Sequence, residues 1–148
     1  GRIDAPNLAA LLADDNKQKL FFSARSQLKW IGRHIGIVPG NVYCVRIASR
    51  VARTYTQQHE LDDISRQLIG LRISRDQQLT DWGAPEFTSA QLDFACNTVL
   101  HLHILRDRLD ALMAKEGREG IARGVFTALP AIVRAELGGW SLEETLAE

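Results

Sequence analysis

The chain has no excess charge of either sign, since 18 lysines and arginines balance 18 aspartates and glutamates among its 148 residues. It also has little cysteine: Cys44 and Cys96 stand far apart, outside any spacing typical of a zinc site or a disulfide framework. We expect both thiols to be reduced and buried. No apolar run reaches the roughly 18 residues that a membrane-spanning helix needs. These absences predict a soluble, cytoplasmic protein without membrane contact, with residues 1–148 forming a single domain.

The short motifs of several enzyme classes are missing as well. There is no Walker loop, dinucleotide-binding glycine motif, HExxH or GxSxG. His101 and His103 are two residues apart in a predicted helix, so their side chains point to different faces and cannot share a metal ion. What is present, 45% hydrophobic and 24% charged residues, is typical of a globular protein with a packed core.

The charges that are present are unevenly distributed along the chain. Residues 16–59 hold eight lysines and arginines and no acid, and they lie between segments of net charge −2 and −6. A basic segment of this kind can neutralise phosphates, or it can face the acidic remainder of the same fold. Arg46, Arg50 and Arg53 are spaced by four and three residues, which predicts that they share one face of a helix.

The hydrophobic pattern predicts two short strands among several helices. The apolar runs of residues 19–22 and 42–45 have the length of buried strands. Helical spacing follows each run, and a further amphipathic helix beginning at residue 61 is expected to end near Gly70. A short first helix is expected to be capped by Asp4.

The second half of the sequence is predicted to be helical. Thr88 and Gln91 form a capping-box pattern, and the apolar stripe that follows runs without a break to Gly117. This pattern predicts one long helix with a continuous core face. Another helical stretch begins at residue 121, and we expect Pro130 to interrupt it.

Six short segments follow one another in a distinctive order. They are residues 42–50 (VYCVRIASR), 53–56 (RTYT), 68–71 (LIGL), 81–83 (DWG), 91–92 (QL) and 99–103 (VLHLH). Their order and spacing resemble the ribonuclease D family of 3′ to 5′ exonucleases, and in particular a short bacterial subgroup without C-terminal RNA-binding domains. The resemblance runs from about residue 4 to residue 140. It implies a ribonuclease H-like α/β fold, here a mostly helical C-terminal portion with about two strands of the central sheet.

The resemblance also implies where catalytic residues would stand. Exonucleases of this family hold two divalent metal ions with four carboxylates, and a tyrosine or histidine orients or deprotonates the attacking water. Their first motif, Asp-x-Glu, would lie upstream of Gly1. Gln27 occupies the position of the second-motif aspartate, and Phe94 and Thr98 occupy those of the third-motif tyrosine and aspartate. We therefore expect no intact catalytic residue, no metal site and no cofactor in this chain.

Two functional hypotheses follow. The leading one is a degenerate, non-catalytic ribonuclease D-like domain that binds RNA or single-stranded nucleic acid, or serves as a structural subunit. The candidate nucleic-acid-binding residues are Arg25, Lys29, Arg33, Arg46, Arg50 and Arg53. The alternative is a 3′ to 5′ exoribonuclease that uses Mg²⁺ or Mn²⁺, with the missing carboxylates supplied by an upstream segment or another chain.

The resemblance raises a structural question about the two strands. In the family fold the larger part of the sheet precedes them, so on their own they would present an unpaired edge and an uncovered apolar face. A second copy, a different subunit or a rearranged, mostly helical packing could cover them. We accordingly expect either an oligomer or a protein partner at this edge.

Overall fold

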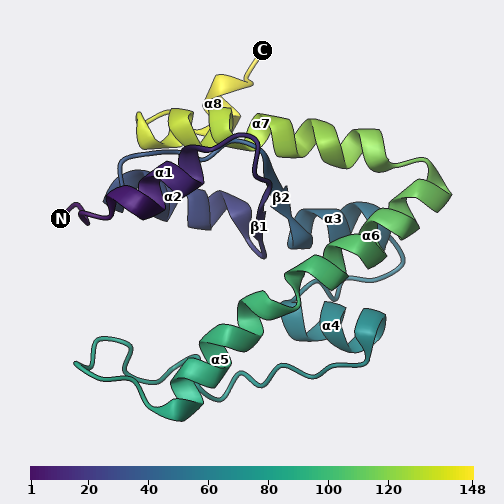
Figure 1. Ribbon diagram of the computed structural model, residues 1–148. Helices are drawn as coiled ribbons and strands as arrows, with labels where there is room; N and C mark the ends of the chain where they lie inside the picture. The colour runs from purple at the N-terminus through teal and green to yellow at the C-terminus, as the bar shows by residue number, and fades with distance from the viewer.

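The computed structural model describes residues 1–148, in which two short strands lie among eight helices (Figure 1). The elements in chain order are α1 (Pro6–Ala13), β1 (Lys19–Phe21), α2 (Ala24–His34), β2 (Val42–Cys44), α3 (Val45–Ala52), α4 (Leu61–Ile69), α5 (Ser89–Leu100), α6 (Leu102–Glu116), α7 (Glu119–Leu137) and α8 (Leu142–Thr145). The strands pair in parallel, with Lys19 opposite Val42 and Phe21 opposite Cys44. The prediction of a mostly helical α/β chain with two strands is confirmed.

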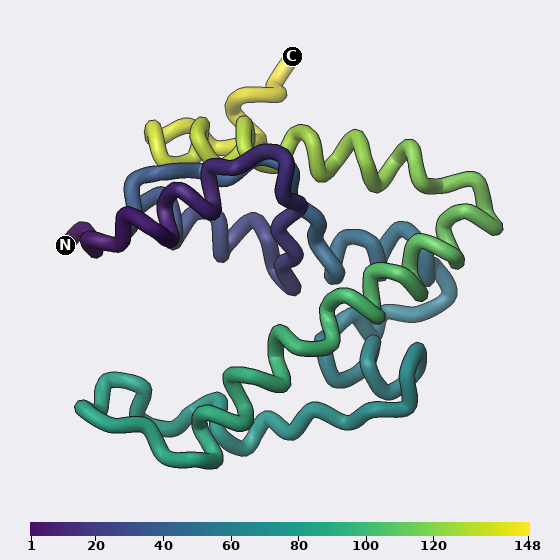
Figure 2. The backbone as a smooth tube through the Cα atoms, viewed as in Figure 1, coloured from purple at the N-terminus to yellow at the C-terminus, as the bar shows by residue number.

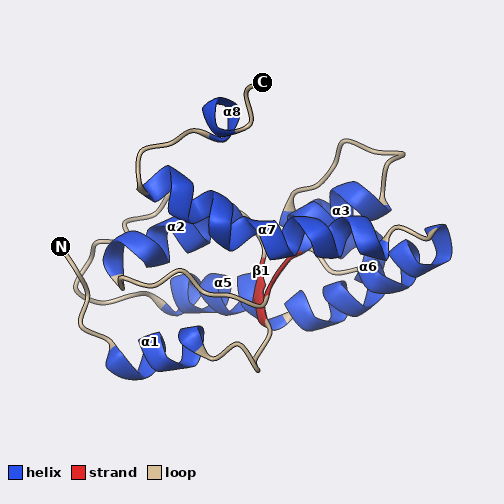
Figure 3. Ribbon diagram, turned by 90° about the horizontal axis from the view of Figure 1, so that it is seen from above, coloured by secondary structure: helices blue, strands red, loops and turns tan.

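The two strands lie at the centre of the molecule, beside α2 and α7 (Figures 1 and 3). Helix α7 packs along α2 closely enough that a side-chain carbon added at Gly32 would come within 2.6 Å of Leu137 Cδ1. Helix α6 packs against α3 and α4 on the other side of the strands. One continuous hydrophobic core results, and its largest completely buried aliphatic side chains are Leu28, Ile64, Leu105 and Leu109.

The helices cover the second strand, which corrects the expectation of an uncovered face there. Val42, Tyr43 and Cys44 are each less than 5% exposed. The Tyr43 ring packs 4.7 Å from that of Phe126 on α7, and its hydroxyl donates to Asp110 Oδ1 on α6 at 2.8 Å. Burial and this carboxylate raise the pKa of the Tyr43 hydroxyl, so it stays a donor. Of the three ways to cover the strands, helical packing is the one that covers β2.

The long helix predicted after residue 88 is divided into α5 and α6 at His101. The capping box of Thr88 and Gln91 is present as predicted. The predicted continuous core face is wrong, because the stripe is buried from Leu102 onward whereas Leu92 and Val99 are about half exposed. Helix α5 extends away from the core, and the chain between α4 and α5 runs beside it (Figure 2). Because α6 lies against the hydrophobic core and α5 does not, only the part of the apolar stripe on α6 is buried.

The sequence predicted the end of α4, an interruption of α7 and the cap of α1, and only the first of these is confirmed. Gly70 ends α4 in a left-handed conformation, with φ of 68°, as expected from its position. Helix α7 continues through Pro130, which is buried, so the predicted interruption is wrong. Asp4 does not cap α1, whose N-cap is Ala5 without a side-chain hydrogen bond.

The two cysteines are both free, but only one of them is buried. Cys44 lies in the core, whereas Cys96 is exposed on α5, so the prediction for Cys96 is wrong. The reason is the position of α5 outside the core. None of the helices is long and apolar enough to cross a membrane.

Candidate functional site

The three positions that the sequence resemblance assigns to the family's catalytic motifs meet in space. Gln27, from the first turn of α2, and Phe94 and Thr98, from α5, line one pocket of about 360 Å³. We call it the Gln27 pocket. It also contains Glu60 and Asp62, which come from the beginning of α4. The structure therefore brings together the residues that the sequence resemblance had placed in one site.

The side-chain oxygens of Gln27 and Thr98 are already hydrogen-bonded to backbone groups close to them in the chain. Gln27 Oε1 accepts the N–H of Ser23 at 2.9 Å, and Thr98 Oγ1 donates to the carbonyl of Ala95 at 2.7 Å. The Phe94 ring packs 6.0 Å from the ring of Trp82. The Phe94 position keeps an aromatic ring but carries no hydroxyl that could activate a water.

The residues of the Gln27 pocket do not fit a pair of divalent metal ions. Such ions need several anionic oxygen ligands converging on one point. Glu60 Oε2 instead pairs with Arg46 Nη2 at 2.6 Å, and Asp62 Oδ1 accepts the N–H of Ile73 at 2.8 Å. No group of three or more histidine, cysteine, aspartate or glutamate side chains is arranged to hold a metal ion. We therefore derive no metal-dependent step from this pocket.

A second cavity, of about 510 Å³, lies on the other side of Arg46. We call it the basic groove. Its lining residues are Ser23, Ala24, Arg25, Ser26, Lys29, Cys44, Arg46, Ile47, Arg50 and Glu136. Four cationic side chains thus face a single carboxylate. The excess of positive charge favours an anionic ligand.

Arg46 separates the two cavities. Its guanidinium stacks on the ring of Phe22, with 4.6 Å from Cζ to the ring centroid, and pairs with Glu60. Phe22 and Glu60 line the Gln27 pocket, whereas Arg46 itself lines the basic groove. Its Nε atom is buried and has no hydrogen-bond partner. Arg50, one turn further along α3, is exposed and makes no ion pair, so its charge is available.

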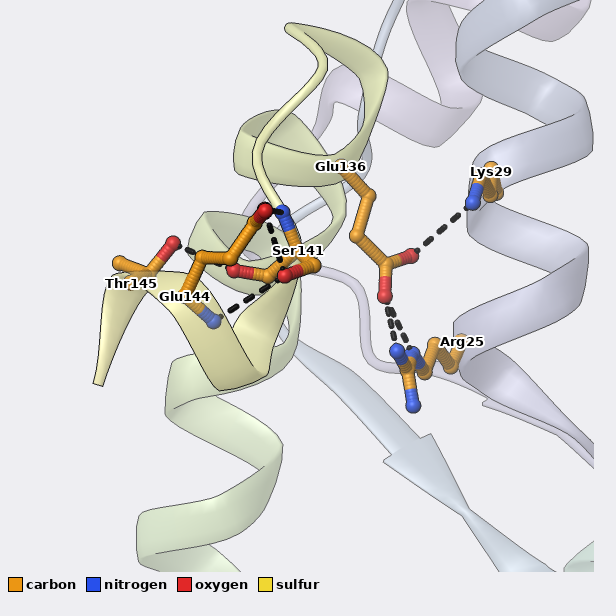
Figure 4. A network of polar contacts seen from close by, with 6 residues as sticks. All are labelled: Arg25, Lys29, Glu136, Ser141, Glu144 and Thr145. Carbon is orange, nitrogen blue, oxygen red and sulfur yellow. Dashed lines mark hydrogen bonds and ion pairs between the residues drawn. The ribbon is translucent and has the colours of Figure 1, made fainter. Parts of the chain in front are cut away.

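Glu136, near the end of α7, holds the other two cations of the groove (Figure 4). Arg25 donates to Glu136 Oε1 through Nε, at 2.8 Å, and also through Nη2. Lys29 Nζ lies 3.3 Å from Glu136 Oε2. The hydrogen bonds from Arg25, reinforced by Lys29, hold the pKa of the Glu136 carboxyl below its usual range. The same contact raises the pKa of Arg25, so Arg25 and Glu136 are both charged near neutral pH.

Arg53 is not part of the groove, which corrects its assignment as a nucleic-acid-binding residue. Helix α3 ends at Ala52 and Arg53 has non-helical φ and ψ of −114° and 59°, so the helical spacing that placed it beside Arg50 does not apply. Its side chain is completely buried and donates to Ser49 Oγ, to the carbonyl of Gln58 and to Gln67. These contacts give Arg53 a structural role in joining α3 to α4.

The structure brings four of the six candidate cations into one groove, namely Arg25, Lys29, Arg46 and Arg50. Arg33 is exposed on α2, two turns beyond Arg25, and is not among the residues that line the groove. Glu136, which lies 111 residues after Arg25, was not among the predicted site residues. No local pattern identifies such a partner, because only the packing of α7 on α2 brings it there.

Comparison with known proteins identifies the family of this chain. The sequence profile of a family described as 3′-5′ exonuclease matches residues 2–114. Ribonuclease D of Nitrobacter hamburgensis is 28% identical over 116 residues, which are 78% of this chain and 30% of that protein. The solved structure of NrnC from Brucella melitensis is 36% identical, with a TM-score of 0.92, and the match covers all of this chain and 72% of that one.

A more distant structure supports the fold alone. RNase D of Escherichia coli is 17% identical with a TM-score of 0.80, and the match covers 89% of this chain and 35% of that one. The chain spans about three tenths of the length of the curated ribonuclease D relatives that it matches. The profile match over most of the chain, together with the fold, establishes that the chain belongs to the ribonuclease D-like family of 3′-5′ exonucleases, with their ribonuclease H-like fold.

Proposed function

We propose that this chain is a non-catalytic member of the exonuclease family that binds single-stranded nucleic acid, RNA in particular, through the basic groove. The observation that carries the proposal is the pairing of two neighbouring cavities. In the Gln27 pocket, the positions of two family carboxylates hold the neutral side chains Gln27 and Thr98. In the basic groove, four cations surround one acid.

The loss of the ligands is the first support. Two ions of charge +2 need anionic oxygens to offset their charge, and an amide or a hydroxyl oxygen is a poor substitute. Carboxylates supplied from outside the chain would still leave Gln27, Phe94 and Thr98 in place. The phenylalanine retains the volume of a tyrosine without its hydroxyl, which is the pattern expected where packing is kept and chemistry is not.

The surplus of cations is the second support. Arg25, Lys29, Arg46 and Arg50 come from two helices and converge on one groove, whose lining contains a single acid, Glu136. Arg46 also pairs with Glu60, which lies outside the groove, so two cations remain in excess. A polyanion that enters such a groove releases condensed counterions, which makes the binding favourable at low salt. Brucella melitensis NrnC has been solved both with bound pGG and with bound Mg²⁺. If this chain binds a short oligonucleotide but no Mg²⁺, it shares only the first of these two properties with NrnC.

A salt-dependent binding titration tests the proposal. A fluorescently labelled single-stranded pentaribonucleotide is titrated with the protein at 50 and 200 mM salt, and fluorescence anisotropy is measured. If about three phosphates are neutralised, the affinity should fall roughly tenfold to thirtyfold between the two salt concentrations. Absence of binding at 50 mM salt would overturn the nucleic-acid proposal.

The alternative function is a 3′ to 5′ exoribonuclease, and the family membership is the observation that favours it. It is tested on the same labelled RNA with Mg²⁺ or Mn²⁺, followed by separation of the products by length. We expect intact RNA after prolonged incubation with either metal. Stepwise trimming from the 3′ end that is abolished by a chelator would establish the enzyme and overturn the non-catalytic proposal.

We also infer a protein contact, either with a second copy or with another chain. The apolar surface that supports it lies on α5 and the start of α6, where Leu92, Val99, Leu100 and Ile104 are between 44% and 65% exposed. Several large apolar side chains exposed within one helical segment indicate a candidate contact surface. Sedimentation velocity of the purified protein tests self-association, and size measurement in native lysate tests a different partner. A monomer in both would contradict this inference.

A further inference from the structure

Trp140 is held in a fixed position just beyond the end of α7. Its backbone N–H donates to the carbonyl of Ala135 at 3.0 Å, and the backbone N–H of the preceding Gly139, whose φ is 98°, donates to the carbonyl of Glu136. A side-chain carbon added at Gly138 would lie 2.7 Å from Trp140 Cζ3, so the six-membered ring rests against the Gly138 backbone. The side chain is nevertheless 63% exposed. The indole is thus supported by the turn on one side and open to solvent over most of its surface.

This indole borders a cavity that continues the basic groove. The cavity has a volume of about 490 Å³, and Trp140, Ser141 and Glu143 contribute to its lining. Arg25, Lys29 and Glu136 line both this cavity and the basic groove. A ligand can therefore extend from Arg46 and Arg50, past the Glu136 contact shown in Figure 4, to the indole.

The charge changes along this path. At the Arg46 and Arg50 end, four cations face one carboxylate, whereas around the indole the two shared cations face both Glu136 and Glu143. The excess of cations at the first end attracts a phosphate. At the second end the two carboxylates offset the two cations, so a phosphate is attracted only weakly there. An uncharged, flat group suits the second end, because an aromatic face offers stacking without requiring a counter-charge.

We propose that Trp140 stacks on a nucleobase of the bound strand while the neighbouring phosphate lies at the Arg46 and Arg50 end of the groove. This inference rests on the proposed binding of single-stranded nucleic acid and adds a base-binding position to it. Stacking of a base on an aromatic side chain tolerates any sequence, because every base has a π face. The site is therefore expected to recognise single strands over duplexes, whose bases are already stacked.

Two probes of equal charge separate stacking from phosphate binding. One is a labelled thymidine pentanucleotide, and the other is the same deoxyribose-phosphate chain without bases. We expect the wild-type protein to bind the first about tenfold more tightly, a typical contribution of one stacked base. Trp140→Leu should remove this preference and leave the affinity for the abasic chain unchanged. Trp140→Phe should retain most of it.

Matched variants make the outcomes distinguishable. Trp30→Leu removes another exposed tryptophan, 51% exposed on α2 and outside both cavities, and should change neither affinity. Circular dichroism checks that each variant is folded. If Trp140→Leu weakens both probes equally, Trp140 shapes the groove and the stacking inference is wrong. If it changes neither while both probes still bind, the inference is again wrong but the proposed function stands. If the wild-type protein binds neither probe, both the stacking inference and the proposed function are wrong.

Discussion

The Gln27 pocket and the basic groove share a wall, yet they differ in what their residues are free to do. In the pocket, Gln27 and Thr98 direct their oxygens to the backbone of their own helices or of the residue just before. In the groove, Arg50 has no ion-pair partner, and Arg46 keeps a buried Nε without a hydrogen bond. Under the proposed function, this difference would mean that the groove retains ligand binding while the pocket has lost the catalytic groups.

The largest effect is expected from reversing the free charge of the groove. Arg50→Glu replaces a cation by an anion beside Arg46 and Lys29, so the affinity for single-stranded RNA should fall about tenfold or more at 50 mM salt, with a smaller salt dependence. Anisotropy titration at several salt concentrations measures both. Arg108→Glu, an exposed arginine on α6 outside the two cavities, is the control. Equal losses in the two variants would mean that general charge, and not the groove, governs binding.

The next prediction concerns a double substitution that makes the Gln27 pocket more like a metal site. Gln27→Asp combined with Thr98→Asp places two carboxylates in a cavity that already contains Glu60 and Asp62. We expect Mn²⁺ at about ten times its dissociation constant to stabilise the variant by about 1.4 kcal/mol, which is a rise of roughly 2–4 °C in Tm. The wild-type protein should show no such rise. A wild-type Tm that responds equally to Mn²⁺ would contradict our interpretation of this pocket.

A smaller effect is expected at the carboxylate that opposes the cations of the groove. Glu136→Gln removes the negative charge that holds Arg25 and Lys29, so both cations become available to phosphate. The affinity for RNA should rise by about threefold at pH 7, since one unit of opposing charge is lost. Glu119→Gln, at the other end of α7, should have no effect. Weaker binding by Glu136→Gln would show that the glutamate positions the two cations instead of competing for them.

The smallest effect is the pH dependence of stability that the same contact confers. Because the folded pKa of Glu136 lies below its ordinary value of 4.5, the contribution is complete above that pH and disappears as the pH falls through the folded value. A partly exposed pair of this kind contributes at most about 1 kcal/mol. In urea unfolding, the stability advantage of the wild-type protein over Glu136→Gln should be smaller at pH 3 than at pH 7. A difference that is the same at both pH values would exclude the ion pair as its cause.

Local signals predicted the elements that depend on neighbouring residues. The capping box of Thr88 with Gln91 and the left-handed Gly70 at the end of α4 were both predictable, because each satisfies backbone groups within one helical turn. The gathering of Gln27, Phe94 and Thr98 followed from the family resemblance. Neither kind of signal depends on knowing how distant helices pack.

The errors arose where tertiary packing decides the outcome. Pro130 continues α7, although it lacks an N–H for the helix, because it lies buried beside Leu129 and Val133 in the core. Arg53 is buried because α3 ends one residue earlier than the spacing assumed. Glu136 could not have been identified, since its role depends on α7 lying along α2.

The packing of α7 on α2 also has a consequence for how the chain reaches its folded state. Gly32 and Leu137, Arg25 and Glu136, and Tyr43 and Phe126 are contacts between the first third of the chain and its last quarter. During synthesis, the strands and α2 must therefore wait for α7 before their apolar surface is buried. Contacts of such long sequence separation slow folding and leave the nascent chain exposed to aggregation. We expect the strands and α2 to depend on chaperones until α7 has left the ribosome.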